Sequence, residues 1–135
     1  MRIPAAIVAA AIACAFALPA LAHHSFAMFD RQKMVSISGT VKAFEWTNPH
    51  CWLWVTAKGP DGESVDWGLE TAGPGQLARM GLKRESFKPG DKIVVDFHPL
   101  RDGRKGGQLQ KAALLNGDVF DVQAELKTFS NGGVK

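Results

Sequence analysis

The sequence contains no tyrosine, and only two of its 135 residues are cysteine. One of them, Cys14, lies in an apolar N-terminal run, so Cys51 is the one cysteine of the remaining chain. A chain with one cysteine forms no internal disulfide, and burial of apolar side chains must therefore stabilise the fold. For Cys51 the pattern favours a small, buried apolar residue in a strand over a reactive thiol.

Common enzyme motifs are also missing. No serine lies in a G-x-S-x-G segment, and the spacings H-E-x-x-H, H-x-x-x-H and C-x-x-C do not occur. Asp66 and Glu70 fall on one face of an expected strand, but four residues along a strand separate them by about 13 Å. That distance is too long for the carboxylate pair of a glycoside hydrolase. The sequence predicts a non-catalytic protein.

Charge of one sign is not concentrated in this chain. Lys and Arg number 16 and Asp and Glu number 13, which gives a net charge of +3. The segment 101–105 is a basic loop, and with Lys111 it forms a small basic patch. Because the excess is so small, and because the chain is expected outside the cytoplasm, we predict no nucleic-acid partner.

The N-terminus is typical of a cleavable secretory signal peptide. Residues 3–18 are almost wholly apolar, and Pro19–Ala22 ends in the small-any-small pattern that signal peptidase recognises. The run is short and rich in alanine, unlike a membrane span of about 20 strongly apolar residues. We expect cleavage after Ala22, a periplasmic or secreted mature chain, and no integral membrane segment. A lipoprotein anchored through Cys14 is the alternative, although Ala11 stands where such signals carry Leu.

Alternating apolar and polar residues after a lead-in at 23–33 predict β-structure. We expect five strands, beginning near residues 34, 50, 64, 92 and 109, and a short helix within 73–81 between the third and fourth strands. Gly39 lies in the middle of the long first strand, where a glycine often marks a bulge or bend. Proline and glycine turns at 48–49, 59–62 and 88–91 separate the strands.

This order is that of an OB-fold, a five-stranded Greek-key barrel. A β-sandwich needs about seven strands, so the barrel is favoured. The prediction is therefore an all-β fold with small α content: an OB-like domain over residues 34–129 and a disordered tail at 130–135. Within the last part of the domain, Val119, Val122, Leu126 and Phe129 are spaced like a helix stripe.

The histidines suggest a metal site. Cleavage after Ala22 would give His23 a free α-amine beside its imidazole, and these two nitrogens can chelate one copper ion. A further imidazole, from His50 or His98, would complete a T-shaped set, and Cu(II) prefers such tetragonal nitrogen sites. The arrangement resembles the histidine brace of copper-dependent polysaccharide monooxygenases and of some periplasmic copper carriers. The alternative is that His23 and His24 form a solvated end and His50 caps a turn.

Trp52 and Trp54 share a strand face with His50, and Trp46 lies across the turn at 47–49. In OB-folds the face of the second and third strands is the usual ligand platform. Aromatic rings there can stack on a base, a sugar ring or a peptide side chain. The alternative is that another segment covers these rings: the lead-in with Phe26 and Phe29, or the C-terminal segment with Phe120 and Phe129.

Several segments occur in the order found in a known family: His23–Phe26, Phe29-Asp30, Gly39–Val41, Trp46–His50 and Gly90-Asp91. Over essentially the whole mature chain, the sequence resembles a group of small secreted bacterial proteins classed as a domain of unknown function. The segment W-T-N-P-H is the most specific part of this likeness. The resemblance implies export and one small domain, and it carries no activity.

The sequence thus predicts an exported binding module that holds a copper ion through His23, His24 and His50, which the resemblance favours over His98. The alternative is a metal-independent module. It would bind a peptide, a glycan or a partner protein on an aromatic face that contains Trp46, Trp52 and Trp54.

Overall fold

The computed structural model describes residues 27–122 and 124. Six strands and one short helix follow one another along this part of the chain: β1 (Val35–Glu45), β2 (Trp52–Lys58), β3 (Ser64–Glu70), α3 (Pro74–Arg79), β4 (Lys92–Pro99), β5 (Gly106–Leu114) and β6 (Val119–Asp121). The five expected strands and the helix between the third and the fourth are confirmed. The predicted signal peptide at 1–22 and the predicted tail at 130–135 lie outside the described residues.

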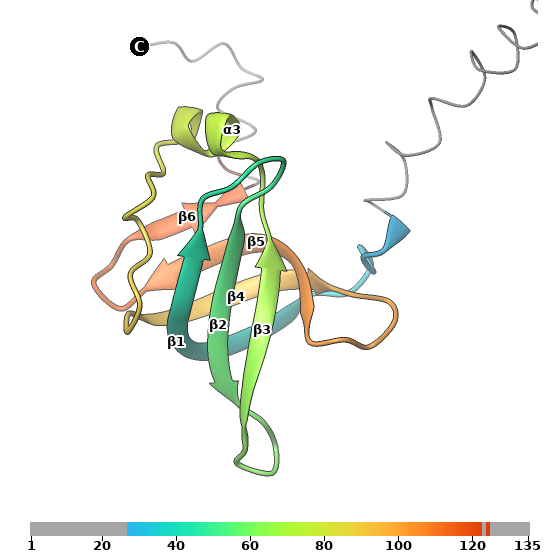
Figure 1. The fold of residues 1–135 in the computed structure, drawn as a ribbon. Coiled ribbons are helices and arrows are strands. Elements are labelled where there is room, and N and C mark those ends of the chain that lie inside the picture. The colour runs from blue at the N-terminus through green and yellow to red at the C-terminus, as the bar shows by residue number, and fades with distance from the viewer. Residues whose placement is uncertain (1–26, 123, 125–135) are drawn as a thin grey trace, which may run out of the picture.

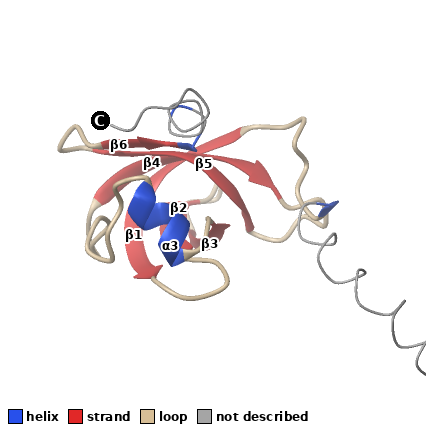
Figure 2. Cartoon of the chain, turned by 90° about the horizontal axis from the view of Figure 1, so that it is seen from above, coloured by secondary structure: helices blue, strands red, loops and turns tan. Residues whose placement is uncertain are grey.

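The strands form one sheet in the order β3-β2-β1-β4-β5-β6, and a β3–β5 pairing closes it. Neighbouring strands are antiparallel, whereas the closing pair is parallel and joins Gly68–Glu70 to Gly106–Gln108. Strands β1 to β5 thus make the predicted OB-like barrel. Helix α3 lies at one end of the barrel, near the connection between β1 and β2 (Figures 1 and 2). No helix in the described part of the chain is long and apolar enough to cross a membrane.

Strand β1 takes part in both halves of the barrel. Its residues 35–40 pair with β4 and its residues 39–45 pair with β2. Gly39 belongs to both pairings, and a Cβ there would lie only 2.5 Å from the carbonyl oxygen of Thr56. The close approach of β2 explains the glycine, but the bulge expected at Gly39 is elsewhere, since the register shifts between Val41 and Ala43.

That bulge changes which side chains point inward. Lys42 is the extra residue, so the inward face passes from Val41 to Phe44 rather than to Ala43. Phe44 packs against the core cluster, and Val41 is 2% exposed. Ala43 would share the inward face with Val41 in a regular strand, but it does not, because one extra residue reverses the alternation.

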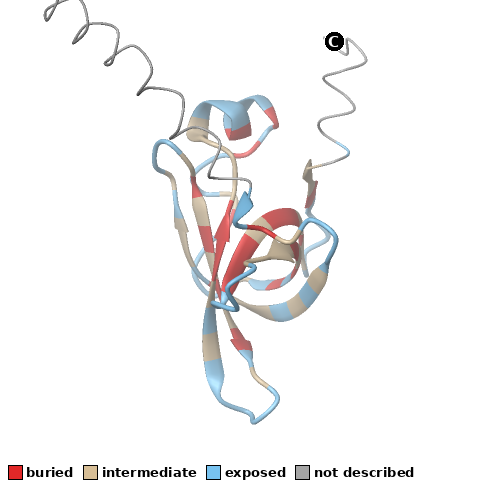
Figure 3. Ribbon diagram, turned by 90° about the vertical axis from the view of Figure 1, so that its right-hand side faces the viewer, coloured by how far each residue is buried: buried red, intermediate tan, exposed pale blue. Residues whose placement is uncertain are grey.

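The core lies between the strands, and Figure 3 shows in red where buried residues lie along them. Leu53 and Val55 of β2 and Phe97 of β4 have no exposed surface. Cys51 is equally buried, so the interpretation of this residue as a core side chain is confirmed. Leu77 of α3, 1% exposed, closes the end of the barrel over the same cluster.

The expected helical stripe from Val119 is wrong at its start, because residues 119–121 form β6 and pair with β5. A tight turn at Asn116-Gly117 produces this hairpin: the amide of Leu114 donates to the carbonyl of Asp118 at 2.9 Å, and Gly117 has φ 99°. Asn-Gly is a strong hairpin signal, and it outweighs the helical spacing of the apolar residues here. Leu126 and Phe129 lie outside the described residues.

Candidate functional site

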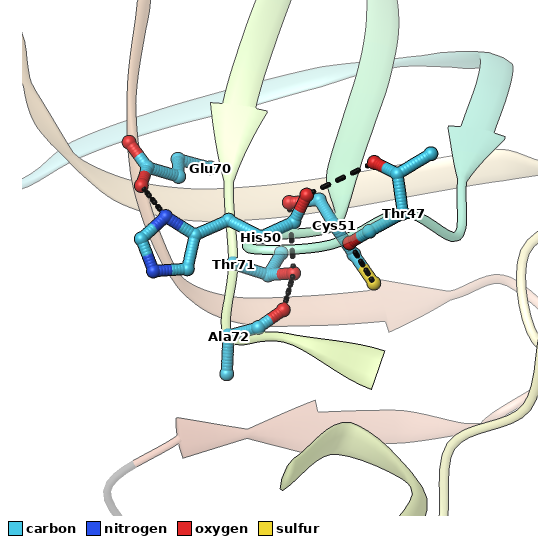
Figure 4. A network of polar contacts seen from close by, with 6 residues as sticks. All are labelled: Thr47, His50, Cys51, Glu70, Thr71 and Ala72. Atoms are coloured by element: carbon cyan, nitrogen blue, oxygen red, sulfur yellow. Dashed lines mark hydrogen bonds and ion pairs between the residues drawn. The ribbon is translucent and has the colours of Figure 1, made fainter. Parts of the chain in front are cut away.

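His50 lies near the end of the β1–β2 connection, two residues before the start of β2. Its Nδ1 contacts the carboxylate of Glu70, the last residue of β3 (Figure 4). The backbone brings the two together, because the β2–β3 ladder continues beyond the strands: the amide of Cys51 donates to the carbonyl of Ala72, and the amide of Thr71 to that of Cys51. The hydroxyl of Thr47 donates to the carbonyl of His50 at 3.1 Å and holds the connection from the other side.

The contact with Glu70 fixes how the imidazole is presented. The Glu70 side chain is 12% exposed, whereas the His50 side chain is 40% exposed. The second ring nitrogen points away from the carboxylate in Figure 4. A carboxylate on one ring nitrogen is the usual support of a histidine whose other nitrogen binds a metal. The suggested turn cap, in which His50 donates to a backbone carbonyl, is replaced by this pair.

The other histidines stand differently. His98 Nδ1 lies 2.7 Å from the carbonyl oxygen of Lys33, so this ring ties the end of β4 to the lead-in. His23 and His24 lie outside the described residues. Within residues 27–122 and 124, no group of three His, Cys, Asp or Glu side chains is placed to hold a metal ion. A three-ligand site that includes His50 therefore needs ligands from elsewhere in the chain.

Trp52 and Trp54 lie side by side on the outer face of β2. Their ring centroids are 6.3 Å apart and the ring planes differ by 24°. Both rings line a groove of about 400 Å³, which we call the aromatic groove. Glu45, Glu70, Arg104, Lys105 and the glycines at 68, 106 and 107 line it as well. This is the face of the second and third strands on which OB-folds bind ligands.

The lead-in covers part of this face, as one alternative from the sequence suggested. Phe29 forms an isolated β-bridge with Leu100, is 2% exposed and borders the groove. Figure 1 shows the lead-in beside the β4–β5 loop. Trp52 and Trp54 nevertheless remain half-buried, so the groove stays open to a ligand. Phe26 and Phe129 lie outside the described residues, and Phe120 lines a different cavity.

Trp46 is not brought together with the other two tryptophans. Its ring packs edge-on against Phe44, with the centroids 5.7 Å apart, and Phe44 packs in turn against Phe87. Trp46 is not among the described residues that line the aromatic groove. Its role here is to extend the core at the end of β1.

A second cavity, of about 300 Å³, lies at the end of the barrel next to α3. His50, Arg31, Gln76 and Gln110 line it together with apolar side chains. Glu70 borders this cavity and the aromatic groove, so one carboxylate stands between the two. Sequence reasoning missed Glu70 as the partner of His50 and Arg31 as its neighbour.

The basic loop between β4 and β5 is partly neutralised. Arg104 forms an ion pair with Asp102, its Nε 2.7 Å from the carboxylate. Hydrogen bonds from the Arg104 amide and then from its side chain lower the pKa of Asp102. Lys105 Nζ lies over the Trp67 ring, 5.2 Å from its centroid. Among the described residues, Arg104 is the basic side chain of this loop whose charge is paired with a carboxylate.

Comparison with known proteins extends these observations. No curated protein is significantly similar to the chain. Two crystal structures of Rim1, a mitochondrial single-stranded DNA binding protein from S. cerevisiae, each cover 64% of this chain, at 15% and 12% identity. They are matched over 97% and 96% of their own length, with TM-scores of 0.45 and 0.46, and the likeness concerns the fold alone. A family model matches residues 10–112, and the chain therefore belongs to this family of unknown function, DUF6152.

Proposed function

We propose that the protein is an exported, non-catalytic binding module that holds one copper ion through His23, His24 and His50. The observation that carries this proposal is the contact between His50 and Glu70. It presents one imidazole nitrogen for coordination and holds the ring in place from the other nitrogen. Export rests on the signal-peptide pattern of residues 1–22.

The path of the lead-in supports a site that combines a mature N-terminus at His23 with His50. Met28 borders the aromatic groove together with Glu70, and Arg31 lines the same cavity as His50. His23 lies five residues before Met28 in the sequence, and an extended chain of five residue steps spans at most about 18 Å. A mature N-terminus at His23 can therefore lie at the groove that Glu70, the partner of His50, also borders.

The chemistry of these donors favours copper. The α-amine and imidazole of His23 would supply two nitrogens in one chelate ring, and the imidazoles of His24 and His50 would supply further nitrogens. A set of nitrogen donors of this kind suits tetragonal Cu(II) better than tetrahedral zinc. The described residues offer no thiolate for such a site, because the Cys51 side chain is buried in the core.

The test is a copper titration of protein purified after native export, followed by electron paramagnetic resonance. We expect a one-to-one axial signal with nitrogen couplings, and loss of tight binding in His50→Ala. His98→Ala is the matched control, because that ring already contacts a backbone carbonyl. Copper affinity that survives blocking of the α-amine, or that is the same in His50→Ala, would refute the proposal.

A second candidate function is favoured by the aromatic groove. Two adjacent indole rings in a groove of about 400 Å³ form a stacking surface on the ligand-binding face of the barrel. Here the module would bind a peptide, a glycan or a partner protein without metal. Tryptophan fluorescence in the presence of a chelator tests it, and Trp52→Leu should abolish any shift. A panel that leaves the emission unchanged would argue that the groove has no ligand.

A further inference from the structure

A row of three side chains crosses the aromatic groove. In the antiparallel ladders, Trp52 pairs with Glu45 of β1 on one side and with Glu70 of β3 on the other. Residues directly opposite each other in such ladders point to the same face, with Cβ atoms about 5 Å apart. All three border the groove. The Trp52 indole is thus flanked by two carboxylates.

The charges around the groove are not equally paired. Arg104 is bound by Asp102, and Lys105 lies over Trp67. Glu70 is bound by His50, which neutralises it only when the imidazole is protonated. No described residue forms a hydrogen bond or an ion pair with the carboxylate of Glu45. The Trp52 end of the groove therefore carries uncompensated negative charge beside an aromatic surface.

We propose that the aromatic groove binds an organic ammonium ion at Trp52, between Glu45 and Glu70. The inference rests on the second candidate function, the groove as a ligand site, and names its ligand class. The indole quadrupole attracts a cation, and alkylammonium groups also bury apolar surface on the ring. Glu45 and Glu70 supply the counter-charge. A hydrated metal ion has no apolar surface to bury against the rings, and a neutral ligand leaves Glu45 uncompensated.

The neighbouring features fit a small ligand rather than a long chain. The groove has about 400 Å³, within the range of small-molecule sites, and Phe29 and Leu100 lie along one side of it. Trp54 continues the surface next to Trp52 and offers apolar contact to the rest of the molecule. The ammonium group would lie at Trp52, and the remainder of the ligand would extend toward Trp54.

The test compares choline with 3,3-dimethyl-1-butanol, which has the same shape and no charge. Calorimetry and tryptophan fluorescence on the exported protein, with a chelator present, measure both affinities. We expect choline to bind about 5- to 30-fold more tightly, the range of one cation–π contact with a desolvated ring. Glu45→Gln should weaken choline binding about threefold and leave the neutral analogue unaffected.

Two variants keep the result independent of folding. Trp52→Leu removes the ring and should abolish the preference for choline, whereas Glu63→Gln removes an exposed carboxylate in the β2–β3 turn and should change nothing. Equal affinity for the two compounds would overturn the ammonium proposal and leave the groove as a ligand site. Binding of a glycan or peptide but not of choline would have the same meaning. If none of the compounds bound, both the ammonium proposal and the second candidate function would be overturned.

Discussion

The indole of Trp54 lies over Gly68, its cross-strand partner on β3. A Cβ at position 68 would stand 2.9 Å from the ring atoms Cη2 and Cζ3. The absence of a side chain at this position lets the ring approach the backbone of β3. One side of the aromatic groove is therefore set by a glycine on the strand opposite.

Gly68→Ala should displace Trp54 and loosen the packing of β2 on β3. We expect a loss of about 1–3 kcal/mol in the free energy of unfolding, typical of overpacking at a close contact. Urea denaturation followed by tryptophan emission measures both effects. Ser64→Ala, at the exposed start of β3, is the control and should stay within about 0.5 kcal/mol of the parent. An unchanged midpoint in Gly68→Ala would contradict this account of the groove.

Leu53 carries much of the core at the middle of β2. Its side chain has no exposed surface, so Leu53→Ala should cost about 2–5 kcal/mol, the sum of lost burial and a cavity. Leu115→Ala makes the same chemical change at a side chain that is 77% exposed, and should cost less than about 0.5 kcal/mol. Similar losses in the free energy of unfolding for the two variants would show that the Leu53 side chain is not part of the core.

The Cys51 thiol should be inert in the folded protein. It is fully buried, and burial raises its pKa, so the reactive thiolate is scarce at neutral pH. We expect a chain without residues 1–22 to react slowly with a thiol-specific reagent at pH 8, and quickly once urea unfolds it. Rapid labelling without denaturant would show that the start of β2 opens readily.

The ion pair between Lys42 and Asp66 predicts a contribution to stability that depends on pH. The Lys42 ammonium, and then the Thr56 hydroxyl, lower the pKa of Asp66 below its ordinary value of 3.8. A carboxyl with a lowered folded-state pKa stabilises the protein above its unfolded-state pKa, and this contribution is lost as the pH falls through the folded value. Asp66→Asn should therefore destabilise the protein at pH 7 and differ progressively less from the parent below pH 3.8.

Thermal unfolding between pH 2 and pH 7 measures that difference. Because both side chains are exposed, the effect at neutral pH should be small and should shrink in high salt. Glu85→Gln, an exposed carboxyl on the α3–β4 connection, is the control. A difference that grows toward acid pH would contradict the assignment of the pair.

Local signals in the sequence were sufficient for most of the barrel. Alternation located β1 to β5, and the Pro-Gly turns separated them. The helix between β3 and β4 followed from Pro74 and Gly81. The bulge at Lys42 was missed because a glycine in the middle of a strand often marks a bulge, so the bulge was expected at Gly39. The glycine is instead required by the close approach of the Thr56 backbone. β6 was missed because the apolar spacing was given more weight than Asn116-Gly117.

The candidate site was harder to predict, for a physical reason. The pairing of Trp52 with Glu70 does follow from the hairpin, since the turn at 59–62 sets Lys58 opposite Ser64 and fixes the register. The β4–β5 loop reaches the groove only through the parallel β3–β5 closure. That contact joins residues about 40 apart in the chain, and local patterns do not specify such non-local pairings. Arg104 and Lys105 thus could not be assigned to the groove from sequence.

Glu70→Gln tests whether the negative charge of the Glu70 carboxylate, rather than its volume, supports His50. The substitution keeps the volume and removes the charge that holds His50 Nδ1. Loss of such a support typically weakens metal binding about 10- to 100-fold, and we expect this range for copper on the exported protein. Asp66→Asn is the control, because it removes a carboxylate on the same strand that contacts Lys42 and Thr56 rather than His50. If Glu70→Gln bound copper as tightly as the parent while His50→Ala did not, His50 would be a ligand that needs no orientation by Glu70. If both variants bound copper like the parent, the imidazole would serve only to pair a buried carboxylate.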